Sequence, residues 1–231
     1  MGVAYNSRIV TDGLVLCLDA ANRKSYPTTG TVWTDLSGNG NNGTLTNMDG
    51  TNFDSANGGS LEFNGSNEFV PIGSTGFPTS NSAGTLSAWA RTNTITGGFV
   101  FIVSYGGSTT NAARFLGITN TSGGNPIPCS FLFGGYANDI TASGVPLNTW
   151  FNMAGVYTGT NASMYVNGVL VSGPTAKSWN TNSGNANIGR QTNGNEYWNG
   201  NISQVSIYNR ALTAAEIAQN YDALKGRYGL T

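Results

Sequence analysis

Oxygen-bearing side chains crowd the ten residues DLSGNGNNGT, at positions 35–44. Asp35, Ser37 and Asn39 stand at alternate positions, and Gly40 follows them. Calcium prefers carboxylate, amide and carbonyl oxygens, and the EF-hand loop presents them at alternate positions around a glycine that permits a sharp bend. The first half of this segment therefore has the residue types and the spacing of a calcium-binding loop.

The second half of the segment departs from that pattern. The twelfth position of an EF-hand loop carries a bidentate Glu, whereas this chain has Thr46. Asp35, Asn39 and Asn41 remain, with backbone carbonyls, as a partial calcium site. The alternative is a turn in which glycines adopt positive φ and the Asp and Asn side chains bond to their own backbone. We favour the turn because a single carboxylate anchors calcium poorly.

The chain offers few groups for catalysis. It contains no histidine, which removes the commonest general base and the usual zinc ligand. Its 11 acidic residues are scattered singly, and the pairs Glu62 with Glu68 and Asp49 with Asp54, which are close in sequence, straddle turns. A glycosidase needs two carboxyl groups about 5 to 9.5 Å apart, which only tertiary contacts would assemble here. We therefore expect a protein that is not an enzyme and has no catalytic residues.

Four aromatic residues lie in loops rich in Gly and Asn, where binding residues are common. They are Tyr105, Tyr136, Trp179 and Tyr197. Sugar-binding sites combine an aromatic ring, which packs on the apolar face of a sugar, with amides and carboxylates that bond to hydroxyl groups. Asp139, near Tyr136, supplies such a carboxylate. These five residues are the candidates for carbohydrate binding, and the alternative is that the rings cover the end of a sandwich.

The overall charge excludes two classes of partner. Ten basic residues against 11 acidic ones give a net charge of −1, so neither nucleic acid nor anionic lipid would find a basic surface. No apolar run reaches the roughly 18 residues of a membrane span, and the first ten residues lack the pattern of a signal peptide. We expect a soluble protein made inside the cell, in which Cys17 and Cys129 stay reduced.

Short runs rich in Val, Ile, Phe, Tyr and Thr recur along the chain, separated by Gly, Asn and Ser clusters. Such even spacing is typical of an antiparallel sandwich or barrel. The sharpest signal is a hairpin over residues 162–171, in which Asn167 and Gly168 suit a type I′ turn. Three tryptophans in strand-like runs are expected in the core: Trp89, Trp150 and Trp198.

One helix is expected near the C-terminus, over residues 213–226. Thr213 and Glu216 have the spacing of a capping box, and Gly226 is suited to end the helix. The apolar face of this helix consists of Ile217, Tyr221 and Leu224. We expect that face to pack on the outside or the edge of the sandwich, unless a partner subunit covers it.

The order of several segments resembles a known family. The segments are GLVLCLDAAN, WTDLSGNGNNGTLTN, GGSLEFNGSNEFVPIG, TLSAWART, NTWFNMAGVYTGTNASMYVNGVLV and YWNGNISQVSIYNRALTAAEIAQNY. Together they resemble the concanavalin A-like, laminin-G-like jelly-roll family over residues 12–228. The resemblance implies an all-β fold, a two-sheet antiparallel jelly-roll sandwich with one short C-terminal helix. No boundary interrupts the chain, so we expect a single domain over residues 1–231, with an N-terminal arm at residues 1–11.

Members of this family bind glycans or proteins, and some relatives cleave glycans with a clustered E-x-D-x-x-E motif that this chain lacks. The opening IVTDGLVLCLDAAN and the ending NRALTAAEIAQNYDALKGRYGL look like those of members encoded by aquatic bacteriophages. The resemblance implies a virion surface protein, assembled in the host cytoplasm, that adheres to cell-surface or extracellular polysaccharide. The alternatives are a structural decoration, cement or tail protein contacting other virion subunits, with oligomerisation left open, and a glycan-cleaving enzyme.

The family also often holds a calcium ion between the loop that begins at Asp35 and the segment WNGNISQV. An acidic residue is usual after the stretch NG-x-I, whereas this chain has Ser203. Ser203 completes the candidate calcium ligands, but one formal charge is missing. The resemblance therefore implies weak calcium binding or none.

Overall fold

The computed structural model describes residues 8–95, 98–107, 109–120, 129–134, 138–192, 194 and 196–231, with the backbone alone for residues 129–133 and 143. These residues form two sheets of eight strands each, and every strand pair described is antiparallel. The two-sheet jelly-roll sandwich expected from the sequence is therefore confirmed.

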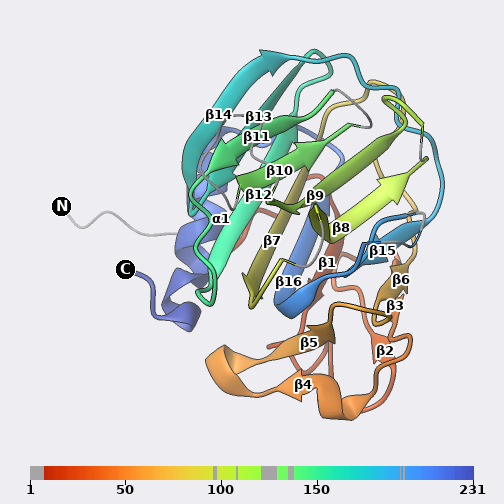
Figure 1. The fold of residues 1–231 in the computed structure, drawn as a ribbon, viewed down its shortest axis with the longest axis vertical. Coiled ribbons are helices and arrows are strands. Elements are labelled where there is room, and N and C mark those ends of the chain that lie inside the picture. Colours follow the sequence, from red (N-terminus) through yellow and green to blue (C-terminus); the bar gives the residue numbers. More distant parts are fainter. Residues whose placement is uncertain are drawn as a thin grey trace.

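Sheet A has the strand order β14 (Val169–Ala176), β13 (Asn161–Val166), β12 (Phe151–Tyr157), β7 (Gly84–Thr92), β16 (Asn199–Tyr208), β5 (Ser60–Asn64) and β4 (Phe53–Asp54), and β1 (Leu14–Asp19) also pairs with β16. Sheet B has the order β11 (Ile140–Ser143), β10 (Cys129–Phe133), β9 (Ala113–Thr119), β8 (Phe99–Gly106), β15 (Ala186–Ile188), β6 (Val70–Ile72), β3 (Gly43–Thr44) and β2 (Val32–Trp33). The helices described are α1 (Ala214–Leu224) and the short 3-10 helices η1 (Gly50–Asn52), η2 (Ala56–Gly58) and η3 (Lys225–Tyr228). Figure 1 shows α1 beside the end of sheet A that holds β12, β13 and β14.

Apolar side chains from the inner faces of both sheets fill the space between them. Trp33, Phe151 and Trp198 are fully buried in this main core. Phe151 and Trp198 meet edge to face, with 6.5 Å between the ring centroids. Full burial of one large apolar side chain contributes about 1.5 to 3 kcal/mol to folding, so this layer holds the two sheets together. The expected burial of Trp198 is confirmed.

The hairpin expected over residues 162–171 joins β13 to β14. Asn167 and Gly168 have φ values of 51° and 77°, the positive values that a type I′ turn requires at both central positions. The turn also docks on β12, because the Asn167 side chain accepts a hydrogen bond from the Asn152 backbone N–H at 2.9 Å. The hairpin prediction is confirmed.

Helix α1 begins at the capping box expected from the sequence. The Thr213 hydroxyl accepts a hydrogen bond from the Glu216 backbone N–H at 3.3 Å, and the Glu216 carboxylate accepts one from the Thr213 backbone N–H at 2.8 Å. The C-terminal end differs from the prediction, because Gly226 does not end the helical stretch. The α-helix ends at Leu224, η3 continues it, and Gly229 follows with a φ of 70°.

The apolar face of α1 packs on the outer face of sheet A. Tyr221 stacks on Trp89, with 5.5 Å between the centroids, and Tyr228 of η3 stacks on the same ring at 4.2 Å. Trp150 packs against Tyr228 at 4.8 Å. Trp89 and Trp150 are therefore buried as predicted, but under the helix rather than between the sheets. Contact with Trp89 and Trp150 explains why the chain stays helical past Gly226.

The sequence contains two cysteines and no apolar run of the length of a membrane span. Cys17 is a free, buried thiol, and burial raises its pKa to about 12, so it is not a reactive thiolate at neutral pH. The side chain of Cys129 lies outside the described residues. In the part of the chain that the structure describes, no helix is long and apolar enough to cross a membrane.

Candidate functional site

The segment at positions 35–44 forms a turn that its own groups stabilise. Asp35 is buried. Its Oδ1 accepts hydrogen bonds from the backbone N–H groups of Cys17 and Ser37, both at 2.9 Å. Its Oδ2 accepts from the Ser37 hydroxyl at 2.7 Å and from the Asn41 backbone N–H at 3.0 Å. A carboxylate offers about four acceptor positions, and protein donors occupy that number here.

The other candidate calcium ligands are also used by the protein. The Asn41 amide donates to two backbone carbonyls at 2.8 and 2.9 Å. Asn39 is exposed, and its amide donates to a serine hydroxyl at 3.1 Å. Ser203 is fully buried; its hydroxyl donates to a backbone carbonyl at 2.6 Å and accepts from the Tyr228 hydroxyl at 2.8 Å.

Asp35 and Ser203 meet β1 at different points. Asp35 binds the N–H of Cys17, whereas the Ser203 carbonyl accepts from the N–H of Ala20 at 2.8 Å. Three residues of strand span about 10 Å. Among the described residues, no group of three or more His, Cys, Asp or Glu residues is placed to hold a metal ion. Asp35, Asn39, Asn41 and Ser203 therefore do not fit a calcium ion, and the loop is a structural turn.

Tyr105 and Trp179 are core residues rather than exposed ligand contacts. Tyr105 is 2% exposed, and its ring meets Phe77 edge to face at 5.1 Å between centroids. Trp179 is 1% exposed, and its ring stacks on Tyr157 at 4.4 Å. A sugar cannot stack on a ring that protein atoms enclose, so these two residues leave the candidate set. Tyr136 lies outside the described residues.

A buried arginine supports the Tyr157–Trp179 stack. Arg114 on β9 is fully buried, with its guanidinium carbon 5.1 Å from the Tyr157 ring centroid and 6.0 Å from that of Trp179. Its Nε donates to the Thr181 hydroxyl at 3.0 Å, and its Nη2 donates to the Ser82 carbonyl. Cation–π contacts of this kind are strongest where water is excluded. Arg114 thus ties together the chain segments at this end of the sandwich.

A groove of about 440 Å³ opens beside this stack, and we refer to it as the Lys177 groove. Its lining residues are Asn138, Gly159, Thr160, Ala176, Lys177 and Ser178. The Tyr157 hydroxyl bonds to the carbonyls of Gly159 at 2.9 Å and Lys177 at 3.3 Å. Both walls of the groove are therefore fixed to the same buried ring.

Asp139 lies next to the groove, just before β11, and is partly buried. Burial raises the pKa of Asp139 to about 6, and the positive charge of Lys177 partly opposes this rise. One Asp139 carboxylate oxygen is buried without a hydrogen-bond partner among the described residues. Buried acceptors without a partner are rare in native proteins and call for a specific explanation.

Tyr197 belongs to a second cluster, which we refer to as the Tyr197 site. It comprises Phe69, Arg190, Thr192, Glu196 and Tyr197. Arg190 and Tyr197 form an isolated β-bridge. The guanidinium carbon of Arg190 lies 3.5 Å from the Phe69 ring centroid, and Tyr197 meets the same ring edge to face at 6.5 Å. Phe69 and Tyr197 are both partly exposed, so the aromatic pair is open to solvent.

Three buried polar atoms of the Tyr197 site have no hydrogen-bond partner among the described residues. They are Arg190 Nε, Thr192 Oγ1 and Glu196 Oε2. Burial also raises the pKa of Glu196. Protein atoms enclose these three atoms, so the part of the site that solvent reaches is the Phe69–Tyr197 ring pair with the partly exposed side chains of Arg190 and Glu196 beside it. This combination suits a polyhydroxylated ligand.

The predicted candidates do not converge on one place. Trp179 precedes β15 and Tyr197 follows it, so the two residues lie at opposite ends of that strand. Asp139 lies at β11, which β10, β9 and β8 separate from β15. Four strand spacings of about 4.8 Å amount to roughly 19 Å along the sheet. Asp139 and Tyr197 therefore belong to separate sites.

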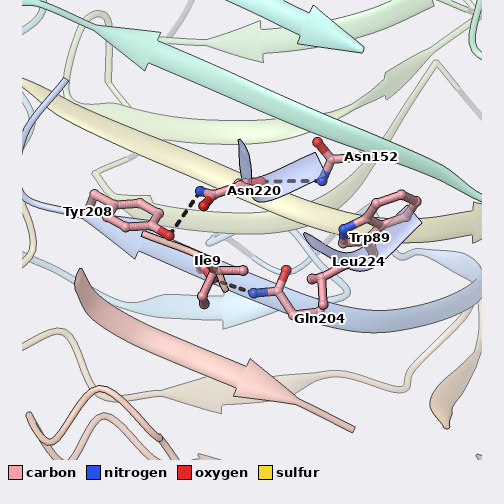
Figure 2. A pocket seen from close by; sticks show the side chains of 9 residues that line it. Ile9, Trp89, Asn152, Gln204, Tyr208, Asn220 and Leu224 are labelled. Atoms are coloured by element: carbon pink, nitrogen blue, oxygen red, sulfur yellow. Dashed lines mark hydrogen bonds between the residues drawn. The ribbon is translucent and has the colours of Figure 1, made fainter. Parts of the chain in front are cut away.

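A small cavity lies between sheet A and α1 (Figure 2). Its volume of about 10 Å³ is close to the smallest space that holds one water. In Figure 2 the Asn220 amide points to the Tyr208 hydroxyl, to which it donates at 3.0 Å. The cavity is lined by Ile9, Ser87, Trp89, Asn152, Gln204, Ser206, Tyr208, Asn220 and Leu224. It is far too small for a sugar and belongs to the packing of the helix.

Five residues of these sites were not predicted from the sequence: Phe69, Arg190, Thr192, Glu196 and Lys177. Phe69 stands in a strand-like run, where an aromatic residue is expected in the core. Glu196 is next to Tyr197 in the sequence, and this proximity was the one signal that pointed to it. The contact between Arg190 and Phe69 joins segments about 120 residues apart, so only the fold reveals it.

Comparison with solved structures gives matches over most of the chain at low identity. Trypanosoma rangeli sialidase is 17% identical with a TM-score of 0.64, over 93% of this chain and 33% of the sialidase. Domain 4 of the GH43 extracellular arabinanase AbnA from Geobacillus stearothermophilus, in complex with arabinotriose, is 17% identical with a TM-score of 0.63, over 90% of this chain and 98% of that domain. The binding domain of Paraclostridial Mosquitocidal Protein 1 is 18% identical with a TM-score of 0.62, over 91% of this chain and 52% of the chain of that binding domain. The chain thus spans about a third of the sialidase.

These matches correct the expected role. A phage virion surface protein, or a decoration or tail protein, was expected from the two ends of the chain, whereas the similar structures are domains of sialidases and of an arabinanase. A comparison with curated proteins gives no match. Residues 64–218 match the family model Laminin_G_3, described as the concanavalin A-like lectin/glucanases superfamily. With two thirds of its length matched and the jelly roll in place, the chain belongs to the Laminin_G_3 family of concanavalin A-like lectins and glucanases.

Proposed function

We propose that this protein is a non-catalytic carbohydrate-binding module that binds a polysaccharide at the Tyr197 site. The observation that carries the proposal is the partly exposed Phe69–Tyr197 ring pair, with the partly exposed side chains of Arg190 and Glu196 beside it. An aromatic ring that solvent reaches can pack on the apolar face of a sugar, and the neighbouring charged side chains can bond to its hydroxyl groups.

The chemistry of the Tyr197 site matches a sugar residue. The ring of Tyr197 offers a flat apolar surface for the C–H groups of a sugar. The partly exposed Arg190 guanidinium can donate hydrogen bonds to sugar hydroxyls, and the Glu196 carboxylate can accept them. One positive and one negative side chain leave the site without a net charge, which favours a neutral sugar over an acidic one.

The comparisons support the same class of ligand. The similar arabinanase domain is in complex with arabinotriose, and nearly all of that domain matches this chain. An identity of 17% supports the fold alone, so the proposal rests on the residues of the site. Arabinotriose is nevertheless a reasonable first probe.

The proposal of a non-catalytic role rests on the carboxyl groups. Asp139 and Glu196 are the two described carboxyl groups whose pKa burial raises, as a general acid requires. Asp139 precedes β11 and Glu196 follows β15, and four strand spacings of about 4.8 Å separate these two strands in sheet B. A glycosidase holds its pair about 5 to 9.5 Å apart. The absence of histidine supports the same conclusion.

Binding to a panel of neutral oligosaccharides and polysaccharides on a glycan array tests the function. We expect saturable binding, weakened about tenfold by Tyr197→Ala and several-fold by Glu196→Gln. Tyr197→Phe should bind like the wild type because it keeps the ring. Glu62→Gln, at an exposed position of β5, is the matched control for Glu196→Gln. Binding that survives both Tyr197→Ala and Glu196→Gln, or reducing-end release from a bound glycan, would overturn the proposal.

A further inference from the structure

We propose that the Lys177 groove is a second saccharide-binding site, which takes a neutral sugar residue independently of the Tyr197 site. The inference rests on the proposed glycan-binding function, but no residue is shared between the two sites. The groove has its own shape, its own polar groups and its own supporting core.

The lining of the groove is rich in groups that bond to hydroxyls. Thr160 and Ser178 contribute hydroxyl groups, and Asn138 contributes an amide. The Asn138 amide donates to the Ser178 carbonyl at 3.2 Å, which fixes the position of Asn138 on the groove wall. A volume of about 440 Å³ lies within the usual range for small-molecule sites.

Two opposite charges define the class of ligand. In the described part of the chain, Lys177 forms no ion pair with a carboxylate. Asp139, next to the groove, is partly exposed and carries the opposite charge. A sugar with neighbouring hydroxyl groups can accept from the Lys177 ammonium and donate to Asp139 at the same time. Because the two charges cancel, the groove favours neutral sugars over uronates and sulfated sugars.

The groove is also held in shape before a ligand arrives. The Tyr157 hydroxyl bonds to the carbonyls of Gly159 and Lys177, one on each wall. The Trp179 ring stacks on Tyr157 at 4.4 Å, and the buried Arg114 lies over both rings. A preformed site loses less conformational entropy on binding than a mobile one. This support keeps the two walls of the Lys177 groove in fixed positions.

Two sites on one chain change what the module does. The Lys177 groove adjoins residues that precede β15, and the Tyr197 site follows that strand. A long polysaccharide that occupies both sites, or two chains that occupy one each, is held with an avidity above the affinity of either site. The second site would therefore matter most for polymers and least for short oligosaccharides.

The experiment is an NMR titration of the ¹⁵N-labelled protein with arabinotriose, cellotriose and any neutral oligosaccharide that binds on the array. We expect saturable shifts at residues 158–160 and 176–179. These shifts should persist in Tyr197→Ala. The affinity that the titration gives should fall about tenfold in Asp139→Asn and in Lys177→Ala. Lys24→Ala, at an exposed position, is the control for Lys177→Ala, and thermal unfolding of each variant verifies the fold.

Each outcome separates the two sites. Shifts confined to residues 190–198 overturn the second site and leave the proposed function intact. Shifts confined to the groove support the second site and overturn the assignment of the first. No shift with any probe, at concentrations that saturate the weakest known binding modules, overturns both. Groove shifts that Asp139→Asn and Lys177→Ala leave unchanged also overturn the second site.

Discussion

The guanidinium carbon of Arg190 lies 3.5 Å from the centroid of the Phe69 ring. The contact joins the loop after β15 to the residue before β6, two segments that the fold brings side by side. Arg190 and Tyr197 also form an isolated β-bridge. The stack and the bridge therefore hold the guanidinium in a fixed position next to Tyr197.

Arg190→Lys is expected to keep the charge and lose the planar stack. A cation–π contact of a partly exposed arginine contributes about 0.5 to 1 kcal/mol, and lysine does not reproduce the flat fork. The free energy of unfolding should fall by about that amount in urea denaturation, and binding at the Tyr197 site should fall about tenfold. Arg23→Lys, at an exposed position, is the control and should change neither quantity.

Asp139→Asn is expected to stabilise the protein at neutral pH. The folded pKa of Asp139, about 6, lies above the ordinary value of 3.8. The folded state therefore binds more protons between these values, and stability falls as the pH rises from about 4 to about 6. Because solvent screens a partly exposed group, the gain on removing the charge should be about 1 kcal/mol at pH 7 and near zero below pH 4.

Urea denaturation of the wild type and of Asp139→Asn at pH 3.5 and pH 7 measures this difference. Glu62→Gln provides the control for removal of an exposed carboxylate. Equal stability of wild type and Asp139→Asn at both pH values would show that burial costs the carboxylate nothing. Weaker groove binding together with a more stable fold would separate the role of Asp139 in binding from its effect on stability.

Much of the fold was predictable because its signals are local. Asn167 and Gly168 form the expected turn since few other residues tolerate positive φ at both positions. The capping box of Thr213 and Glu216 needs only four consecutive residues. The predicted helix end at Gly226 was wrong because a contact between residues distant in sequence decides where the helical stretch ends. That contact is the stack of Tyr228 on Trp89.

The candidate site was predictable only in part, because exposure is a property of the whole fold. Trp179 and Tyr105 stand in loops rich in Gly and Asn, yet Arg114 and the neighbouring rings enclose that end of the sandwich. Tyr197 stays partly exposed in a loop of similar composition. Composition alone does not distinguish the two environments, which explains why the predicted set divided between core and surface.

Glu216 is expected to stabilise the start of α1 in two ways, through the capping box and through an ion pair. Arg210 lies 2.6 Å from its carboxylate and, with the Thr213 backbone, lowers the pKa of Glu216 to about 2. This contribution is present above the ordinary value of 4.5 and is lost as the pH falls through 2. Because both partners are partly exposed, the ion pair should contribute about 0.5 kcal/mol.

Two variants separate the cap from the charge. Glu216→Gln keeps an acceptor for the cap and should cost about 0.5 kcal/mol, whereas Glu216→Ala should cost about 1 to 1.5 kcal/mol. Urea denaturation at pH 7 measures both, and the difference from wild type should shrink at pH 2. If Glu216→Gln costs as much as Glu216→Ala, the ion pair rather than the cap dominates.

Calcium is expected to have little effect on stability, because protein donors already occupy the Asp35 carboxylate. Chelation should leave the melting temperature of the wild type unchanged. Asp35→Ala removes the acceptor for two backbone N–H groups of the turn and the N–H of Cys17, so it should cost about 3 kcal/mol with or without calcium. A calcium-dependent rise in melting temperature that Asp35→Ala abolishes would show that the ion displaces these hydrogen bonds. Because Asn39 is exposed, Asn39→Ala is the control, and it should be nearly neutral under both conditions.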